Sequence, residues 1–342
     1  MFNKMYDIIT FGSATRDIHL KSKAFKVLKD EKDFATGEGL CMAMGSKVDV
    51  EDISFSSGGG GTNVASTFAK QGLKTAFCGA IGADLAGLEI VRELKNTGID
   101  TRFLRKKKEK PTNYSVIVSG GEGGDRTILV YRGASELMKK EDILWKKLKT
   151  KWVYLAPMGN KLMDIFEDVV NFAFENKIKI AVNPSKQQLQ MPAEKLKRIF
   201  SKINVLFLNK EEASILTGIS YDKEQEIFKK IDEICPGIAV MTKGGEGVTV
   251  SDGKYLYFAK PNPDREIVDT TGAGDSFASG FLSGYIKFSG DIVKAIQLGL
   301  ANSEANIAEV GAKTGLLGKK ANFKRVEVIK QLCTENNLCI EK

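Results

Sequence analysis

The feature that most limits the fold is an alternation of apolar strands with helical segments through the second half of the chain. An apolar run over 152–155 precedes a helical stretch that reaches about Phe174, and further apolar runs follow over 178–182, 205–208 and 238–241. Strands that alternate with helices pair in parallel, because each crossover returns the chain to the same edge of the sheet. The sequence therefore predicts an α/β fold with a mostly parallel central sheet flanked by helices.

The segment over 268–277, VDTTGAGDSF, combines a backbone anion site with a carboxylate, and the apolar residues over 277–285 predict the start of a helix. The small residues at 272–274 let successive amides approach a ligand at a helix N-terminus, where negative charge binds best. Asp275 could take a proton from a hydroxyl while a phosphoryl group rests on these amides. This layout is that of a small-molecule kinase. The alternative is a strand-to-helix turn that Asp275 caps.

The string DTTGAGDSF closely resembles the second signature of the ribokinase-like (PfkB) family of carbohydrate and nucleoside kinases, and GGGGTNVA over 58–65 matches the first. The resemblance extends from Asp17 to about Gly311. It implies a ribokinase-like fold and transfer of the γ-phosphoryl group of ATP to a hydroxymethyl group of a sugar or sugar derivative. A nucleoside kinase of the same fold is the alternative. The resemblance makes Asp275 the general base. It also implies that Gly272, Ala273 and Gly274 form the anion hole.

The same resemblance implies which residues bind the acceptor. Gly59 and Gly60 bring backbone close to the substrate, and Asn63 holds one of its hydroxyl groups. Asp17, in the turn over 12–17 after the first apolar strand, matches the family's other hydroxyl-binding carboxylate. From the residues alone, Asp17 could equally be a surface aspartate of that turn.

Three features bear on which acceptor is used. Gly60 stands where ribokinases proper carry a lysine, and the segment over 154–157 lacks their acidic ligand, so ribose is not implied. Arg132 could meet an anionic acceptor such as a sugar acid or sugar phosphate, or it could face solvent.

Two segments between the signatures fit a nucleotide site. Asn209 and Glu212 are three residues apart and share a face if a helix starts here, which suits water-mediated Mg²⁺ binding near triphosphate oxygens. A capped, acidic first helical turn would look the same. The segment over 242–247 resembles the family's loop over the nucleotide phosphates, although by itself it would pass for a hairpin turn. The residues of this loop that we expect to bind nucleotide are Thr242, Gly244, Gly245 and Gly247.

The resemblance also implies nucleotide-binding and cation-binding residues towards the end of the chain. Asn302 falls where relatives shape the adenine pocket, and we expect it to bind the nucleotide together with Gly274. Asp269 and Thr271 match residues that supply oxygens to a monovalent cation in many members. Activation by K⁺ is therefore a hypothesis.

A smaller sheet is expected beside the central one. Residues 113–118 and 126–131 are β-prone runs separated by a glycine-rich segment, which predicts a hairpin with a flexible tip. By resemblance, this hairpin and strands near the N-terminus form a lid over the acceptor, from about 13–57 and 112–132, inserted in one kinase domain over 1–342. Lids pair in many relatives, so a homodimer through the lid is a further hypothesis.

Composition excludes several other classes. The net charge of +8 and the basic run over 105–110 could indicate nucleic-acid binding, but the basic residues are dispersed without interleaved aromatics, and we expect the run to lie in a solvated loop. One histidine and the absence of P-loop or dinucleotide fingerprints disfavour triad hydrolases and Rossmann oxidoreductases. No signal pattern or apolar run of about 20 residues occurs, so we expect a cytoplasmic protein without membrane contact. A non-catalytic binding protein on this scaffold is disfavoured by intact Asp275, Asn63 and Asp17.

Overall fold

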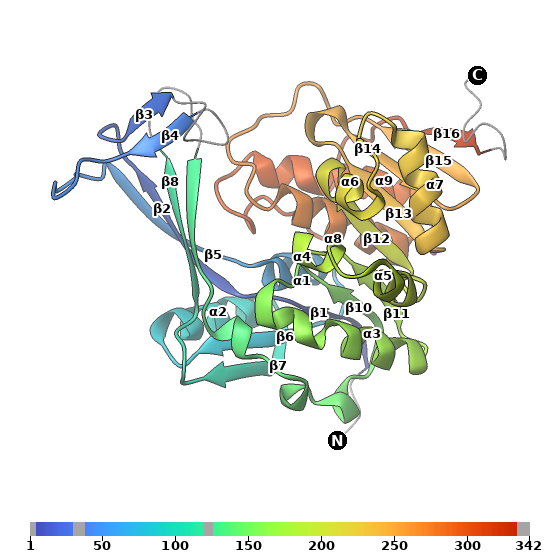
Figure 1. The fold of residues 1–342 in the computed structure, drawn as a ribbon, viewed down its shortest axis with the longest axis horizontal. Helices are drawn as coiled ribbons and strands as arrows, with labels where there is room; N and C mark the ends of the chain where they lie inside the picture. Colours follow the sequence, from blue (N-terminus) through green and yellow to red (C-terminus); the bar gives the residue numbers. More distant parts are fainter. Residues whose placement is uncertain (1–4, 30–37, 120–125, 334–342) are drawn as a thin grey trace.

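A computed structural model describes residues 5–29, 38–119 and 126–333. These residues form a central ten-stranded sheet (Figure 1). In spatial order its strands are β16 (Ile329–Leu332), β15 (Tyr255–Ala259), β14 (Val248–Ser251), β13 (Ile238–Thr242), β12 (Val205–Asn209), β11 (Lys179–Val182), β10 (Thr150–Leu155), β1 (Tyr6–Phe11), β6 (Thr75–Gly82) and β7 (Asp100–Lys107). The strands from β7 to β13 pair in parallel, and β14 to β16 add antiparallel pairs at one edge.

Helices cover both faces of this sheet, as the alternating pattern predicted. The helices are α1 (Gly60–Lys70), α2 (Leu85–Asn96), α3 (Phe166–Glu175), α4 (Lys186–Leu189), α5 (Ala193–Phe200), α6 (Lys210–Thr217), α7 (Glu224–Ile234), α8 (Ala273–Lys287) and α9 (Ile292–Ile307). Apolar residues of α3, α5 and α7 share one core cluster with the sheet, and those of α1, α8 and α9 share another. Both faces are buried because β-strands with helical crossovers carry apolar residues on each side.

A separate small sheet stands beside the central sheet, at the left of Figure 1. Its strands, in order, are β5 (Asp52–Gly58), β2 (Thr15–Lys21), β8 (Asn113–Ser119) and β9 (Arg126–Tyr131). β8 and β9 form the predicted antiparallel hairpin, whose tip over 120–125 lies outside the described residues. β3 (Lys26–Lys29) and β4 (Glu38–Cys41) pair as a further two-stranded sheet.

The expectation that the basic run over 105–110 lies in a solvated loop is only partly correct, because 108–110 form a bend whereas 105–107 belong to β7. Arg105 and Lys107 belong to β7 and pair with β6 rather than lying in a loop. The Nε atom of Arg105 donates to the backbone oxygen of Asp142 at 2.7 Å, and Nζ of Lys107 lies 2.7 Å from the Asp142 carboxylate. β7 is an edge strand, and charged side chains on an edge disfavour pairing with another chain.

Within the described ranges, no helix has both the length and the apolar character that crossing a bilayer requires.

Candidate active site

The residues predicted to form the anion hole lie at the N-terminus of α8, and the helix begins four residues earlier than the apolar pattern predicted. Gly272 is the N-cap residue, with a left-handed φ of 81°, and Ala273 is the first helical residue. A Cβ atom on Gly272 would lie 2.7 Å from Cβ of Ala312, so both the backbone angle and the packing require glycine. The amide of Ala273 already donates to the backbone oxygen of Thr270 at 3.2 Å. Gly274 is exposed, in the first turn, where amides lack partners within the helix.

Asp275 does not cap this helix. Its Oδ2 atom accepts a hydrogen bond from Nδ2 of Asn63 at 2.8 Å, so the carboxylate is directed towards α1. Burial raises the pKa of Asp275 above its ordinary value, and the bond from Asn63 opposes that rise. A carboxyl group with a raised pKa beside backbone donors can act as a proton acceptor near neutral pH.

The start of α1 lies against Asp275. Gly59 is the N-cap residue with a φ of 94°, and a Cβ atom there would lie 2.6 Å from the backbone oxygen of Ser13. A Cβ atom on Gly60 would lie 3.6 Å from Oδ1 of Asp275 and 3.2 Å from Cβ of Ala156. Gly60 therefore brings backbone close to the Asp275 carboxylate, and the predicted approach of substrate to these glycines stays a prediction.

Asn63 has a further capacity for hydrogen bonding. Its side chain is 6% exposed, and its Oδ1 atom is buried without a partner. A buried acceptor without a partner costs free energy of folding unless a ligand or a water molecule donates a hydrogen bond to it.

The predicted turn location of Asp17 is wrong. Asp17 lies within β2, where it pairs with Ser56 of β5 and Ser115 of β8, and it is 6% exposed. Burial raises its pKa, and a hydrogen bond from Ser115 opposes the rise. A surface aspartate is thus excluded. The polar residues after the first strand gave no signal that the chain extends at once into the small sheet.

Lys313 is a charge with only 10% of its side chain exposed, and the sequence did not single it out. Its Nζ atom donates to Oγ of Ser57 at 2.7 Å and lies 3.2 Å from Oε1 of Glu93. Burial lowers its pKa, while the charges of Glu93 and Asp17 oppose that change. Lys313 therefore links the segment after α9 to the C-terminal end of β5, and its charge interacts with the Asp17 carboxylate.

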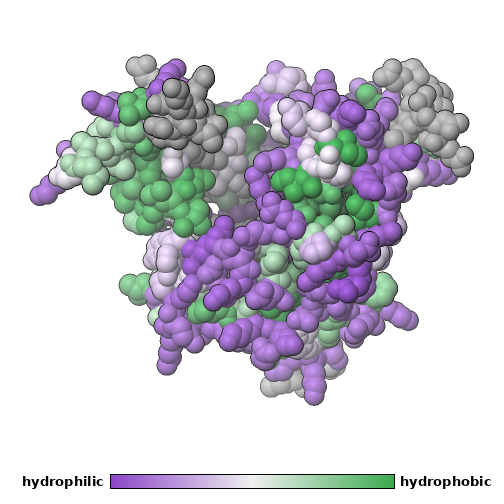
Figure 2. All heavy atoms as spheres, in the orientation of Figure 1, coloured by the Kyte–Doolittle hydropathy of each residue, from purple (hydrophilic) through white to green (hydrophobic). Residues whose placement is uncertain are grey.

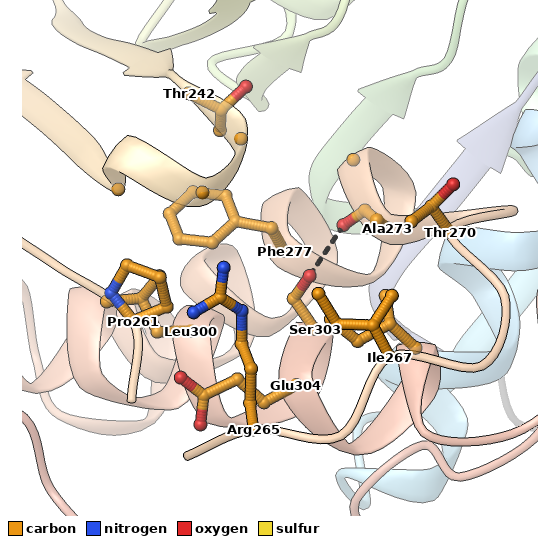
Figure 3. Close-up of a pocket in the computed structure, with 15 residues that line it drawn as sticks. Thr242, Pro261, Arg265, Ile267, Thr270, Ala273, Phe277, Leu300, Ser303 and Glu304 are labelled. Carbon is orange, nitrogen blue, oxygen red and sulfur yellow. Dashed lines mark hydrogen bonds between the residues drawn. The ribbon is translucent and has the colours of Figure 1, made fainter. Parts of the chain in front are cut away.

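A cavity of about 240 Å³ adjoins the N-terminus of α8 (Figure 3). The predicted nucleotide residues that line it are Thr242, Gly244, Gly245, Gly247 and Gly274, together with Ala273 of the predicted anion hole. Other lining residues, which the sequence did not reveal, are Pro261, Arg265, Ile267, Thr270, Phe277, Leu300, Ser303, Glu304 and Ile307. The cavity thus brings the glycine loop (residues 242–247) and the first turn of α8 to a common space.

Asn302 is not brought into this cavity. Its side chain is fully buried, donates to the backbone oxygen of Ser276 at 2.7 Å and accepts from the amide of Leu317 at 2.9 Å. Its neighbour Ser303 faces the cavity instead, and its Oγ atom donates to the backbone oxygen of Ala273 at 3.0 Å (Figure 3). Asn302 and Ser303 are adjacent on α9, and one residue along a helix turns the side chain by about 100°.

Asn209 and Glu212 form a reciprocal capping box at the start of α6. The Asn209 side chain accepts from the amide of Glu212 at 2.8 Å, and Oε2 of Glu212 accepts from the amide of Asn209 at 2.8 Å. Burial raises the pKa of Glu212, and the negative charges of Glu211 and Asp275 contribute to the rise. The helix-cap alternative is therefore correct, and the Glu212 carboxylate also interacts electrostatically with Asp275.

Asp269 links the turn before α8 to the segment after α9. Its Oδ1 atom accepts from the amide and hydroxyl of Thr271 at 2.9 and 2.7 Å, and Oδ2 accepts from the amide of Gly311 at 2.9 Å. Asn306 donates to the backbone oxygen of Gly311 at 3.0 Å, and its own Oδ1 atom is buried without a partner. Oxygen atoms are thus concentrated where the cation was predicted. No cluster of three histidine, cysteine or acidic side chains suited to a metal occurs in the described residues.

Arg132 is exposed just beyond β9, and its charge contributes to lowering the pKa of Glu136. The described contacts do not bring it to Asp275 or to the cavity. A role in binding an acceptor therefore stays a prediction.

Known proteins match almost the whole chain. The family model of the pfkB family of carbohydrate kinases matches residues 8–318. Ribokinase of Staphylococcus aureus is 28% identical over 286 residues, covering 80% of this chain and 89% of the relative. Cytidine kinase of Thermococcus kodakarensis is 27% identical over 260 residues, covering 74% and 88%. The structure of Arabidopsis thaliana ribokinase complexed with ribose and ATP superposes with a TM-score of 0.76 at 21% identity, covering 93% of this chain and 97% of that one. The chain therefore belongs to the pfkB family of carbohydrate kinases.

Proposed function

We propose that this protein transfers the γ-phosphoryl group of ATP to a hydroxymethyl group of a sugar or sugar derivative, with Asp275 as the general base. The family assignment already makes it a phosphotransferase with an alcohol acceptor. The observation that carries the residue assignment is the Asp275 carboxylate, half-buried at the first turn of α8 and held by Nδ2 of Asn63 at 2.8 Å.

In the proposed reaction, the acceptor hydroxyl donates its proton to Asp275 as its oxygen bonds to the γ-phosphorus, and the bond to the β-phosphate oxygen breaks. The amides of Gly272, Ala273 and Gly274 stabilise negative charge on the transferring group. The Ala273 amide must exchange its bond to Thr270 to take part. Catalysis of this kind depends on positioning and electrostatics more than on covalent chemistry.

The acceptor is proposed to lie between the small sheet and α1. Asp17 and Asn63 bind its hydroxyl groups, since both are buried polar side chains, and Asn63 contacts Asp275 and has an unpartnered oxygen. Gly59 and Gly60 allow the substrate to approach backbone. A nucleoside acceptor is the second candidate, because curated relatives include cytidine and nucleoside kinases.

ATP is proposed to bind the cavity between the glycine loop and α9. Mg²⁺ suits this site because it usually keeps several waters and uses one or two carboxylates with substrate phosphates. Glu212 fits as a carboxylate acting through water, with Asn209 beside it. The bound ion would neutralise charge on the β- and γ-phosphates during transfer.

K⁺ activation is proposed from the oxygen atoms around Asp269 and Thr271. Asn306, whose Oδ1 atom has no partner, donates through Nδ2 to the backbone oxygen of Gly311, and the amide of Gly311 donates to Asp269. Rates measured in potassium, sodium and choline chloride should be highest in potassium. Equal rates in the three salts would exclude this part of the proposal.

The small sheet is proposed to act as a lid, built from 13–57 and 112–132 of a single domain over 1–342. Large apolar residues are exposed on it, including Ile53, Phe55, Leu129 and Val130, each more than half exposed. Figure 2 shows the apolar surface on this part of the molecule, at the left. Pairing of two lids would cover it, so light scattering should give the mass of a dimer. A monomer at micromolar concentration would contradict this assignment.

The experiment that tests the function is ADP release from Mg-ATP across hexoses, pentoses, sugar acids, sugar phosphates and nucleosides. We expect one acceptor to stand out, and whether it is a sugar or a nucleoside decides between the two candidates. ATP binding without ADP release for any acceptor would instead favour the binding-protein alternative.

A further inference from the structure

The cavity lining contains one cationic side chain, Arg265, among the residues that the structure describes. Arg265 lies in the segment between Pro261 and Ile267, which also line the cavity. Figure 3 shows its guanidinium directed into the cavity towards Phe277. Its Nη1 atom donates to the backbone oxygen of Asn262 at 3.0 Å. Its Nη2 atom lies 3.2 Å from the position a Cβ atom would take on Gly245, so the side chain spans from this wall to the glycine loop.

No carboxylate of the described chain forms an ion pair with Arg265. Glu304 lines the same cavity, but its Oε1 atom accepts from the amide of Asn262 at 2.6 Å. An arginine directed into a cavity without an anionic partner is suited to an anionic ligand, because its planar fork matches phosphate oxygens.

The lysines near the glycine loop are engaged elsewhere. Lys243 within the loop lies 3.0 Å from Oε2 of Glu224, and only 14% of its side chain is exposed. Lys210, at the start of α6, lies 2.5 Å from Oε1 of Glu246. These two ion pairs hold the loop against α6 and α7. They leave Arg265 as the cation that faces the cavity.

We propose that Arg265 binds a phosphate group of the nucleotide, on the part of the triphosphate that does not transfer. The transferring group belongs at the first turn of α8, beside Asp275, whereas Arg265 meets the glycine loop at Gly245. Arg265 thus supplies the protein cation that neutralises the nucleotide, a contribution that kinases need in addition to a metal ion. This inference rests on the proposed function, since it requires that the cavity binds ATP.

Equilibrium binding to the full-length protein, by calorimetry without acceptor, separates this role from others. Arg265→Ala should lower the affinity for ATP and for ADP by about ten- to a hundredfold, the loss expected for a charge-assisted hydrogen bond. Adenosine, which has no phosphate, should bind as it does to the unaltered protein. Arg265→Lys should recover part of the loss, because a point charge lacks the planar fork.

The matched control is Arg198→Ala, which removes the same charge from the exposed face of α5, where Arg198 pairs with Glu167. It should bind every nucleotide normally. Unchanged ATP and ADP affinity in Arg265→Ala would overturn the inference, as would an equal loss for adenosine, which would indicate contact with the base or ribose. Unaltered protein that binds no ATP would refute the proposed function itself. Retained adenosine binding shows that Arg265→Ala is folded, and if that variant does not fold, Arg265→Gln provides the same comparison.

Discussion

The hydrogen bond from Asn63 to Asp275 gives a quantitative test of how the pKa of the proposed general base is set. Asn63→Ala removes the Nδ2 donor that lies 2.8 Å from Oδ2 of Asp275. Burial already raises the pKa of Asp275, and Asn63 opposes that rise by favouring the charged form. Without this donor the pKa rises further, so the carboxylate stays protonated to higher pH.

The size of the effect follows from the bond that is lost. A hydrogen bond to a charged group contributes about 1.5–3 kcal/mol, which corresponds to about ten- to a hundredfold in the protonation equilibrium. At acid pH, kcat/KM of Asn63→Ala should therefore be lower than that of the unaltered protein by a large factor. That factor should exceed the loss seen at alkaline pH by about ten- to a hundredfold. Any loss that persists at alkaline pH measures the separate contribution of Asn63 to binding the acceptor.

The assay is the pH dependence of kcat/KM for the best acceptor, because this quantity reports ionisation of the free enzyme. Ser66→Ala provides a matched control, since Ser66 lies on the same helix, is buried, and donates to the backbone oxygen of Thr62 without touching Asp275. Its acid midpoint should match that of the unaltered protein. An unmoved midpoint in Asn63→Ala would refute the reasoning that this bond tunes the base.

Three further substitutions test the site. In Gly58→Ala, the new Cβ atom would lie 2.1 Å from Oδ2 of Asp17, and displacing that carboxylate should lower kcat/KM for the acceptor by about a hundredfold while calorimetry finds ATP affinity unchanged. Gly272→Ala should lower the free energy of unfolding in urea by at least about 1–2 kcal/mol, because a side chain is strained at a φ of 81°. Burial lowers the pKa of Lys313 in the folded protein, so between this pKa and the ordinary lysine value the unfolded chain binds more protons than the folded one. Raising the pH through this range should therefore increase the free energy of unfolding of the unaltered protein more than that of Lys313→Met. Equal pH dependence of urea unfolding in the two proteins would contradict that account.

Features set by local chemistry could be predicted from the sequence. The parallel sheet follows from strand-helix alternation, and the β8–β9 hairpin follows from two β-prone runs around glycines. The glycines at 59 and 272 mark backbone with positive φ at the start of a helix, which other residues rarely adopt. These signals depend on short stretches of chain and survive without knowledge of the tertiary structure.

Features set by tertiary contact could not be predicted. Asp17 became buried only because β2 pairs with two strands that are distant in sequence. Lys313 and Arg265 are single basic residues in irregular segments, and their environments come from β5, α2 and the glycine loop. The predicted start of α8 was late because small residues at 273–276 have no apolar periodicity, although a glycine N-cap begins the helix there.

The most direct test of the central claim is turnover of Asp275→Asn with saturating Mg-ATP and the best acceptor, with ATP affinity measured in parallel. The substitution keeps the shape of the side chain and removes the base. The account predicts that kcat falls by at least about a hundredfold while ATP binds nearly as before. Turnover close to that of the unaltered protein would contradict the assignment of Asp275 as the general base.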